Sequence, residues 1–137
     1  MLANEDVIIR LALSVLAGAL IGLEREKSKH PAGLRTHMLV CVGSTLITLT
    51  SIEMFPNDQA RIAAGIVTGI GFLGAGMIFK DKNHVRGLTT AASTWSVAGV
   101  GLALGTGAYF ISAAATVAIL LTLGLSRIRI FGKSKKW

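Results

Sequence analysis

The chain has 137 residues, of which 52% are hydrophobic and 15% are charged, and its mean hydropathy is +0.63. This composition excludes an ordinary soluble domain and predicts an integral membrane protein. The net charge of +7 would also suit a nucleic-acid-binding protein, so the positions of the basic residues must decide between the two classes. The single cysteine, Cys41, excludes an internal disulfide and is expected to act as a small hydrophobic side chain.

Five apolar segments follow one another along the chain, and each is long enough to cross a bilayer as a helix. We expect an all-α membrane protein, a compact bundle of five transmembrane helices. The predicted spans are about 6–23, 36–54, 62–79, 88–105 and 108–126. Together they form one transmembrane domain, residues 1–126, which a basic tail, residues 127–137, follows.

The basic residues lie in alternate connections between these segments. Twelve of the 14 Lys and Arg residues are placed in this way: Arg25, Lys27, Lys29, Arg35, Lys80, Lys82, Arg86, Arg127, Arg129, Lys133, Lys135 and Lys136. Because short basic connections stay in the cytoplasm, the N-terminus is predicted outside and the C-terminus inside. Topology and contact with lipid headgroups then explain the charge, so the expected partner is the lipid bilayer and not nucleic acid.

Glycines recur at a spacing of four residues in three of the segments. The pairs are Gly18 with Gly22, Gly65 with Gly69, and Gly101 with Gly105. Small residues at this spacing let helices approach closely in lipid. The third segment adds Gly71, Gly74 and Gly76 on more than one helix face, which predicts a central helix with neighbours on both sides.

Three of these glycines, Gly69, Gly71 and Gly74, also match the G-x-G-x-x-G pattern of nucleotide-binding turns. That pattern requires a preceding strand, whereas here it lies inside an uncharged apolar segment, so helix packing is favoured. A broken helix that lines a site is the alternative.

Two segments carry polar side chains at helical spacing: His37, Ser44, Thr48 and Ser51 in the second, and Thr89, Ser93 and Ser96 in the fourth. Their hydroxyls could bond to carbonyls of the same helix or bridge to a neighbour, and this is the favoured interpretation. The alternative is a hydrated interior face.

Charged groups inside the segments are few. Arg10 and Glu53, both near the outer surface, could pair, although Arg10 is more readily explained by snorkelling to the headgroups. No acidic residue is predicted near the bilayer centre, which disfavours a carboxylate relay for protons or metal but leaves open a pore lined by hydroxyls or carbonyls. The spacing of His30, His37 and His84 fits no metal site. We therefore expect no enzyme activity, no cofactor and no metal site.

Three blocks carry a resemblance: "LIGLEREKSKHPAGLRTHMLVCVGS", "GIGFLGAGMIFK" and "VRGLTTAASTWSVAGVGLALG". In this order they resemble the MgtC/SapB family of bacterial inner-membrane proteins, over about residues 12–125. The resemblance implies a multi-pass protein of the cytoplasmic membrane that is tied to growth in low magnesium and, in pathogens, to survival inside macrophages. Many relatives carry an ACT-like domain after the last span. Here eleven residues follow Ser126, so the resemblance covers the transmembrane domain only.

The matched blocks place polar residues at the cytoplasmic boundary. The cluster comprises Glu24, Arg25, Glu26, Arg35, Thr36, Arg86, Thr89 and Thr90. We expect Glu24 and Glu26 to pair with Arg35 and Arg86 and to tie three helix ends together. The alternative is that these are solvated charges at headgroup level.

The resemblance implies a regulator more than a transporter. The expected function is a small regulatory protein that binds another membrane complex, with the ATP synthase or a transporter as the partner. A homodimer is also expected, because glycines on several faces leave small-residue surface to cover. The alternative is a channel or carrier for Mg²⁺ or another cation.

Overall fold

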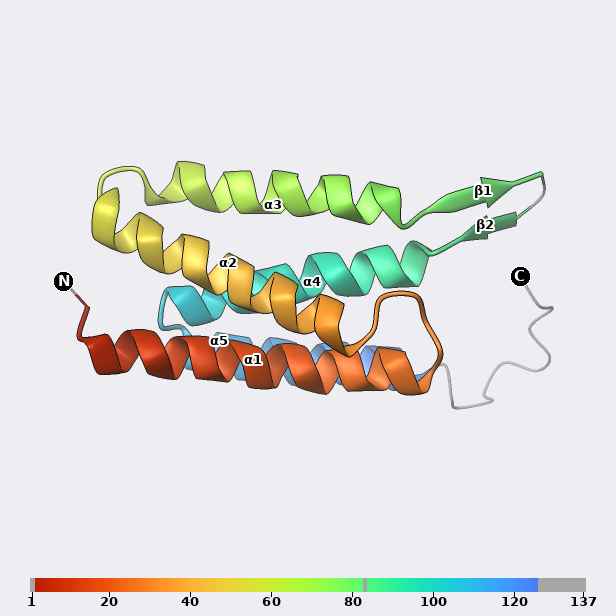
Figure 1. The fold of residues 1–137 in the computed structure, drawn as a ribbon, viewed down its shortest axis with the longest axis horizontal. Coiled ribbons are helices and arrows are strands. Elements are labelled where there is room, and N and C mark those ends of the chain that lie inside the picture. Colours follow the sequence, from red (N-terminus) through yellow and green to blue (C-terminus); the bar gives the residue numbers. More distant parts are fainter. Residues whose placement is uncertain (1, 83, 126–137) are drawn as a thin grey trace.

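The computed structural model describes residues 2–82 and 84–125, which form five helices and one short hairpin (Figure 1). The helices are α1 (Asn4–Lys27), α2 (Leu34–Met54), α3 (Gln59–Gly76), α4 (Leu88–Gly105) and α5 (Tyr109–Gly124). Two three-residue strands, β1 (Phe79–Asp81) and β2 (His84–Arg86), separate α3 from α4. Successive helices run in opposite directions, so the chain is an up-and-down bundle.

The helices fall at the five apolar segments, and the predicted boundaries differ from the observed ones by at most four residues. The two prolines, Pro31 and Pro56, lie in the connections that follow α1 and α2. Proline lacks the backbone N–H that a helix interior needs, so both positions suit chain reversals. Two helices, α1 and α2, are both long enough and apolar enough to cross a membrane.

The fold is all-helical apart from the short hairpin, as predicted, but the hairpin corrects the end of the third segment, which was predicted to remain helical to Phe79. Instead α3 ends at Gly76, and β1 pairs with β2 in antiparallel register, with Phe79 opposite Arg86. Gly87 closes the hairpin with a positive φ of 89°, and a side chain there would collide with the carbonyl oxygen of Met77. Only glycine fits this position. Because Gly87 fixes this chain reversal, α3 ends about one helical turn earlier than its apolar pattern predicts.

The central helix is α4 and not α3, which corrects the second expectation. Helix α4 contacts all four other helices, whereas the main contacts of α3 are with α2 and α4, and α3 lies along one edge of the bundle (Figure 1). Small residues line the sides of α4, and it therefore fits among several neighbours. Phe72, 82% exposed, shows how little of α3 is covered.

The core lies where α1, α2, α4 and α5 meet. Its most buried members are Ile21, Cys41, Val97 and Val100, each no more than 1% exposed. Cys41 therefore packs as the small hydrophobic side chain that the sequence predicts. Large apolar side chains such as Leu16, Phe72 and Phe110 point outward from the helices, as expected for a surface that faces lipid.

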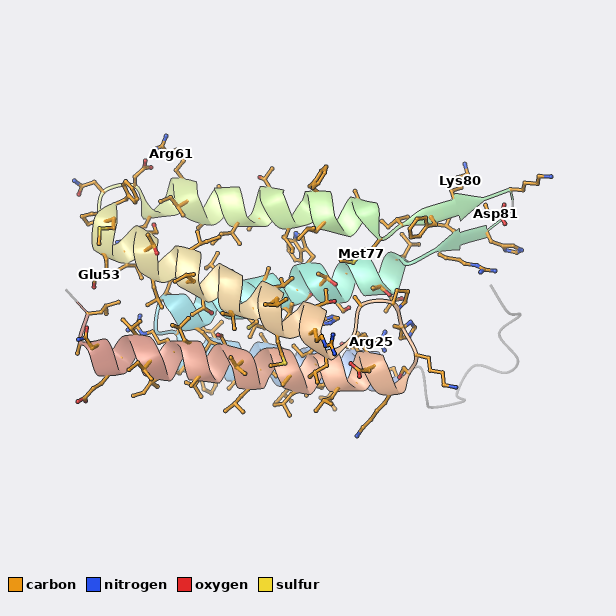
Figure 2. All side chains as sticks on the ribbon, in the orientation of Figure 1. Arg25, Glu53, Arg61, Met77, Lys80 and Asp81 are labelled. Carbon is orange, nitrogen blue, oxygen red and sulfur yellow. The ribbon has the colours of Figure 1, made fainter. Side chains whose placement is uncertain are left out.

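The two ends of the bundle differ in charge. One end, here called the basic end, carries the α1–α2 connection and the hairpin, and Figure 2 shows Lys80 and Asp81 extending beyond the helices there. The opposite end carries the N-terminus and the α2–α3 and α4–α5 connections. Glu53 and Arg61 mark it in Figure 2. The basic connections thus share one end, as alternate connections of an up-and-down bundle must.

Candidate functional site at the basic end of the bundle

A buried arginine anchors the basic end. Arg25, in the last turn of α1, is 1% exposed, and its Nε donates to Oε2 of Glu24 at 2.5 Å. Ser28 Oγ donates to Oε1 of the same carboxylate at 3.0 Å. Figure 2 shows Arg25 where α1 and α2 lie close together. A guanidinium that is removed from water needs such a partner, since a buried charge without one is strongly destabilising.

Glu26 supports the start of α2 and not an ion pair. Its Oε2 accepts a hydrogen bond from the backbone N–H of Leu34 at 2.8 Å, one of the donors that a helix N-terminus leaves free. Arg35 and Arg86 are exposed and make no ion pair within the part of the chain that the structure describes. The expected ties from Glu24 and Glu26 to these arginines are therefore wrong, because the carboxylates find partners closer along the chain.

His37 joins α2 to α4 just inside the basic end. Its Nδ1 lies 2.9 Å from the carbonyl oxygen of Gly33 and its Nε2 lies 3.1 Å from Ser93 Oγ. Both side chains are buried. Since a carbonyl oxygen can only accept, Nδ1 carries a proton and donates to Gly33. Sequence reasoning placed His37 and Ser93 on polar stripes but did not pair them.

The Ser93 hydroxyl can serve this histidine in two ways. It lies 3.0 Å from the carbonyl oxygen of Thr90 as well as near Nε2 of His37. With a neutral ring, Ser93 donates to Nε2. With a protonated ring, Nε2–H donates to Ser93, which then donates to Thr90. Rotation of one hydroxyl thus satisfies both protonation states of His37.

The polar stripe of α2 serves the contact with α4. Ser44 Oγ donates to the carbonyl oxygen of Ala98 at 2.6 Å and Thr45 Oγ1 donates to that of Gly101 at 2.8 Å. Thr48 Oγ1 bonds back to Ser44 O within its own helix. The bonds of Ser44 and Thr48 match the favoured interpretation of the stripe, hydroxyls that bond to carbonyls of the same helix or bridge to a neighbouring helix.

Four of the nine predicted packing glycines lie at close helix contacts. A side chain at Gly18 would lie 2.7 Å from Met38 Cα, and one at Gly22 would lie 2.7 Å from Leu34 Cα, so both bring α1 against α2. Gly101 and Gly105 bring α4 against Cys41 and Thr48 of α2. Close approach of backbones is the contact that glycine allows and larger residues prevent.

The glycines of α3 differ from these four. Side chains at Gly65, Gly69, Gly71 and Gly76 would meet no atom within 4 Å. At Gly74 a side chain would meet only ordinary contacts, 3.7 Å from Ala91 Cβ. These positions therefore leave room on the outer face of α3.

A cavity opens at the basic end between the α1–α2 connection, the hairpin and the start of α4. His30, Arg86, Thr89 and Thr90 supply its polar lining. Burial, and then the positive charge of Arg25, lower the pKa of His30 below its usual 6.5. A neighbouring cavity is lined by Glu26, Arg35 and Thr36. The predicted polar cluster is thus divided between two cavities and the buried Arg25–Glu24 pair.

The opposite end holds the remaining predicted charges. Arg10 Nη1 donates to the carbonyl oxygen of Gly105 at 2.7 Å, while Glu53 accepts from the backbone N–H of Leu2. The two do not pair, and the Arg10 side chain reaches the last turn of α4. There the helix dipole favours a positive charge.

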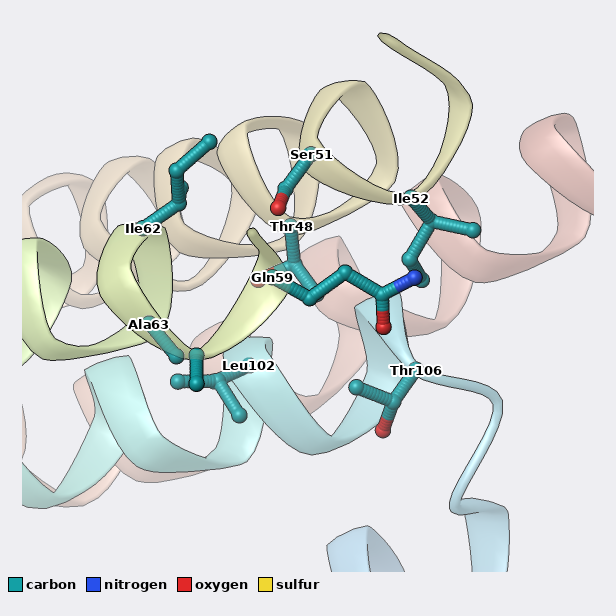
Figure 3. A pocket seen from close by; sticks show the side chains of 9 residues that line it. Thr48, Ser51, Ile52, Gln59, Ile62, Ala63, Leu102 and Thr106 are labelled. Carbon is teal, nitrogen blue, oxygen red and sulfur yellow. The ribbon is translucent and has the colours of Figure 1, made fainter. Parts of the chain in front are cut away.

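A third, smaller cavity lies near this end between α2, α3 and α4 (Figure 3). Its polar lining comes from Thr48, Ser51, Gln59 and Thr106. Ser51 is 2% exposed, and its hydroxyl has no hydrogen-bond partner within the described residues.

Two helices long and apolar enough to cross a membrane, an outward-facing apolar surface and basic residues gathered at one end suggest a helical membrane protein. The sequence model of the MgtC family matches residues 11–129, and the chain belongs to this family.

Curated relatives agree with this assignment. Protein MgtC of Salmonella typhimurium strain LT2 is 48% identical over 113 residues, which is 82% of this chain and 49% of that protein. Protein MgtC of Brucella abortus is 48% identical over 118 residues, 85% of this chain and 50% of that protein. Protein SapB of Bacillus subtilis is 40% identical over 130 residues, 88% of this chain and 56% of that protein. The chain spans about half the length of these relatives. No solved structure matches it.

Proposed function

We propose that the protein is a non-enzymatic regulator in the bacterial inner membrane that acts by binding another membrane complex. Membership of the MgtC family supports a role in adaptation to low magnesium or to stress. The ATP synthase is the partner that we would test first, and a transporter is the second choice. In the proposed orientation all five helices cross the membrane and the basic end faces the cytoplasm.

The outer face of α3 is the observation that carries this proposal. Gly65 and Gly76 lie on it with open space around an added Cβ atom, in a helix whose main contacts are with α2 and α4. Gly69 lines the groove between α3 and α2. In lipid, helices associate by close packing at small residues, and such a face can accept a helix of another protein. The four buried glycines are already occupied within the chain, so they cannot serve a partner.

The same face suits a second copy of the chain, and we expect a homodimer in the absence of a partner complex. Because the second copy and the partner complex would use the same face of α3, the dimer would have to separate before the partner could bind. Chemical crosslinking through single cysteines on α3 would detect it, in a background in which Cys41 is replaced by alanine.

The test is ATP hydrolysis by the ATP synthase in inverted bacterial membrane vesicles, with and without this protein, while the proton gradient is recorded. Inhibition of the complex gives slower hydrolysis together with a smaller gradient. Gly65→Ile should abolish this inhibition and leave the protein folded, because a Cβ atom at Gly65 meets nothing within the chain. Gly99→Ile on α4, where an added Cβ atom also meets nothing, is the matched control. Unchanged hydrolysis would exclude the ATP synthase as the partner.

The second candidate function is a channel or carrier for Mg²⁺ or another cation. The cavity near the opposite end favours it, because Thr48, Ser51, Gln59 and Thr106 offer neutral oxygen ligands between three helices (Figure 3). In the vesicle assay a pore gives faster hydrolysis with a smaller gradient, since dissipating the gradient releases the enzyme from back-pressure. Ion flux in liposomes, compared between the parent chain and Ser51→Ala, would then identify the ion.

A further inference from the structure

We propose that the cavity at the basic end between the α1–α2 connection, the hairpin and the start of α4 binds a phosphate group. The phosphate would be supplied either by an anionic lipid headgroup or by free phosphate. The inference does not depend on the proposed function, since it concerns a ligand of the bundle itself. Five features of the cavity support it: its charge, the helix that opens into it, an unpartnered hydroxyl, the rigidity of its turn, and its position.

The charge of the lining is positive. Arg86 and His30 face the cavity from the hairpin and from the α1–α2 connection, and none of its lining residues is acidic. The nearest carboxylates are engaged elsewhere: Glu24 by Arg25 and Ser28, and Glu26 by the backbone of Leu34. Asp81, on the hairpin, accepts from the N–H of Lys82. An anion in this cavity would thus meet a cation and no competing carboxylate.

Helix α4, which has 18 residues, begins at the cavity. Gly87 occupies its N-cap position, so no side chain caps the helix, and its first turn contains no acidic residue. The N–H groups of Leu88, Thr89 and Thr90 have no partner within the helix and lie beside the lining. A helix start that lacks both a cap and a carboxylate is the arrangement that accepts phosphate in other proteins.

Thr90 supplies the second and independent observation. The residue is 3% exposed and lines the cavity, yet its hydroxyl makes no hydrogen bond within the described residues. Its carbonyl oxygen, in contrast, accepts from both Ser93 and Thr94. The hydroxyl is not among the fully buried unpaired atoms, so it opens to the cavity and is free to donate to a ligand there. An oxygen of a phosphate group in the cavity would accept from it.

The turn before α4 is fixed, which keeps these donors in place without the ligand. Gly87 has a positive φ, and its backbone lies against Met77 so closely that no side chain would fit. The β1–β2 pairing then holds Arg86 opposite Phe79. A site that is already arranged binds with less loss of conformational entropy.

The position of the cavity suits a membrane phosphate. It lies where the apolar helices end and the hairpin begins, which is the depth of the headgroups if α1 and α2 cross the bilayer. Leu88, Phe79 and Val85 are exposed beside it. Apolar side chains around a basic pocket would contact the acyl chains of a lipid whose phosphate is bound inside.

The experiment compares two sources of phosphate with the purified full chain. In one arm inorganic phosphate is titrated in neutral detergent at constant ionic strength, with chloride as the reference. In the other arm the chain is placed in nanodiscs of phosphatidylcholine with or without phosphatidylglycerol. The readouts are the melting temperature and the NMR-detected pKa of His30, which a bound anion should raise. Binding in the first arm identifies free phosphate, and binding in the second alone identifies a headgroup.

Two variants test the site, and a third controls for charge. Thr90→Val removes the unpartnered hydroxyl at nearly constant shape and should weaken binding about tenfold while leaving the ligand-free melting temperature unchanged or higher. Arg86→Gln should abolish the His30 response. Lys80→Gln makes the same change of charge at the same end but lies outside both cavities there, so it should bind as the parent does. Equal weakening by Lys80→Gln, or no response in either arm, would overturn the proposal.

Discussion

Two G-x-x-x-G pairs in this chain have the same spacing and opposite surroundings. Gly101 and Gly105 of α4 touch α2 so closely that no side chain could be added, whereas Gly65 and Gly69 of α3 face open space. The first pair lies in α4, which contacts all four other helices, and the second in α3, whose main contacts are with α2 and α4. The spacing of the glycines therefore shows only that another helix can approach closely. Whether that helix belongs to the same chain depends on the fold. The predictions below test this contrast, from the largest effect to the smallest.

Isoleucine at the two glycine pairs should separate them most clearly. Gly101→Ile forces a branched side chain against Cys41 O and Ser44 Cβ, so we expect a loss of at least about 3 kcal/mol or failure to fold. Gly69→Ile should melt within about 2 °C of the parent, a shift that corresponds to a small free-energy change. Thermal unfolding in detergent, followed by circular dichroism, measures both. Equal losses in the two variants would show that α3 is packed in solution in a way that the bundle alone does not explain.

The next largest difference in stability should be between an ion pair in the interior of the bundle and an exposed ion pair on α3. Arg25, buried beside Glu24, contrasts with Arg61, which pairs with Asp58 at the start of α3 and is 81% exposed along its side chain. Arg25→Gln leaves a buried carboxylate with a weaker partner and should cost about 2 kcal/mol. Arg61→Gln should cost less than about 0.5 kcal/mol, because exposed pairs are screened by water and salt. Denaturant titrations of both variants would decide, and a larger loss for Arg61→Gln would contradict the contrast.

Hydroxyl deletions should show a smaller difference. Thr45→Val removes the bond to the carbonyl oxygen of Gly101 on α4, whereas Thr68→Val removes one to Ala64 within α3 itself. Interhelical hydrogen bonds in membrane proteins contribute about 0.6 kcal/mol on average, so Thr45→Val should destabilise by about that amount. Thr68→Val should be neutral or slightly stabilising, because its valine keeps the shape and removes a bond that bends the helix. A larger loss of stability for Thr68→Val than for Thr45→Val would mean that the hydrogen bonds between α2 and α4 do not stabilise their contact.

Acidification should have the smallest effect. The pKa of His30 is lowered in the folded chain, first by burial and then by Arg25. The unfolded chain therefore binds a proton more readily, and as pH falls through about 6.5 this group contributes a growing loss of stability. His30→Gln should remove that part of the pH dependence between pH 7.5 and 5.5 and leave the value at pH 7.5 unchanged. An identical pH profile for parent and variant would show that His30 is not the group responsible.

Much of the fold follows from the sequence because hydrophobic length and charge act locally. Five segments are apolar over the length of a helix. Two of them, 36–54 and 88–105, were predicted to end at Met54 and Gly105, where α2 and α4 end in the structure. The end of α3 was missed because the turn at Gly87 depends on contact with Met77, ten residues earlier. Apolar periodicity carries no information about such a contact.

The site was predicted less well than the fold. Residues of the basic end were identified by type, but their partners were not, since Glu26 reaches a backbone N–H eight residues away and His37 reaches Ser93 across 56 residues. Charge suggests pairing with the opposite charge, whereas the first partner of a carboxylate near a helix start is an unsatisfied N–H group. A capping interaction would have been the better prediction for Glu26.

The bond between Arg10 and Gly105 has a consequence for how the protein is made. The arginine lies seven residues into α1, but the carbonyl that it binds belongs to the end of α4, 95 residues later in the chain. During synthesis α1 therefore leaves the ribosome with a charge whose partner does not yet exist, and such a charge opposes insertion, although by less than the about 2.5–3.5 kcal/mol of a charge at a helix centre. We expect α1 to remain beside the insertion machinery until α4 arrives, so that α1, although it is synthesised before α4, settles in the bilayer together with it. Shortened chains that end before α4 would then release α1 from the membrane on alkaline extraction, and Arg10→Leu would retain it.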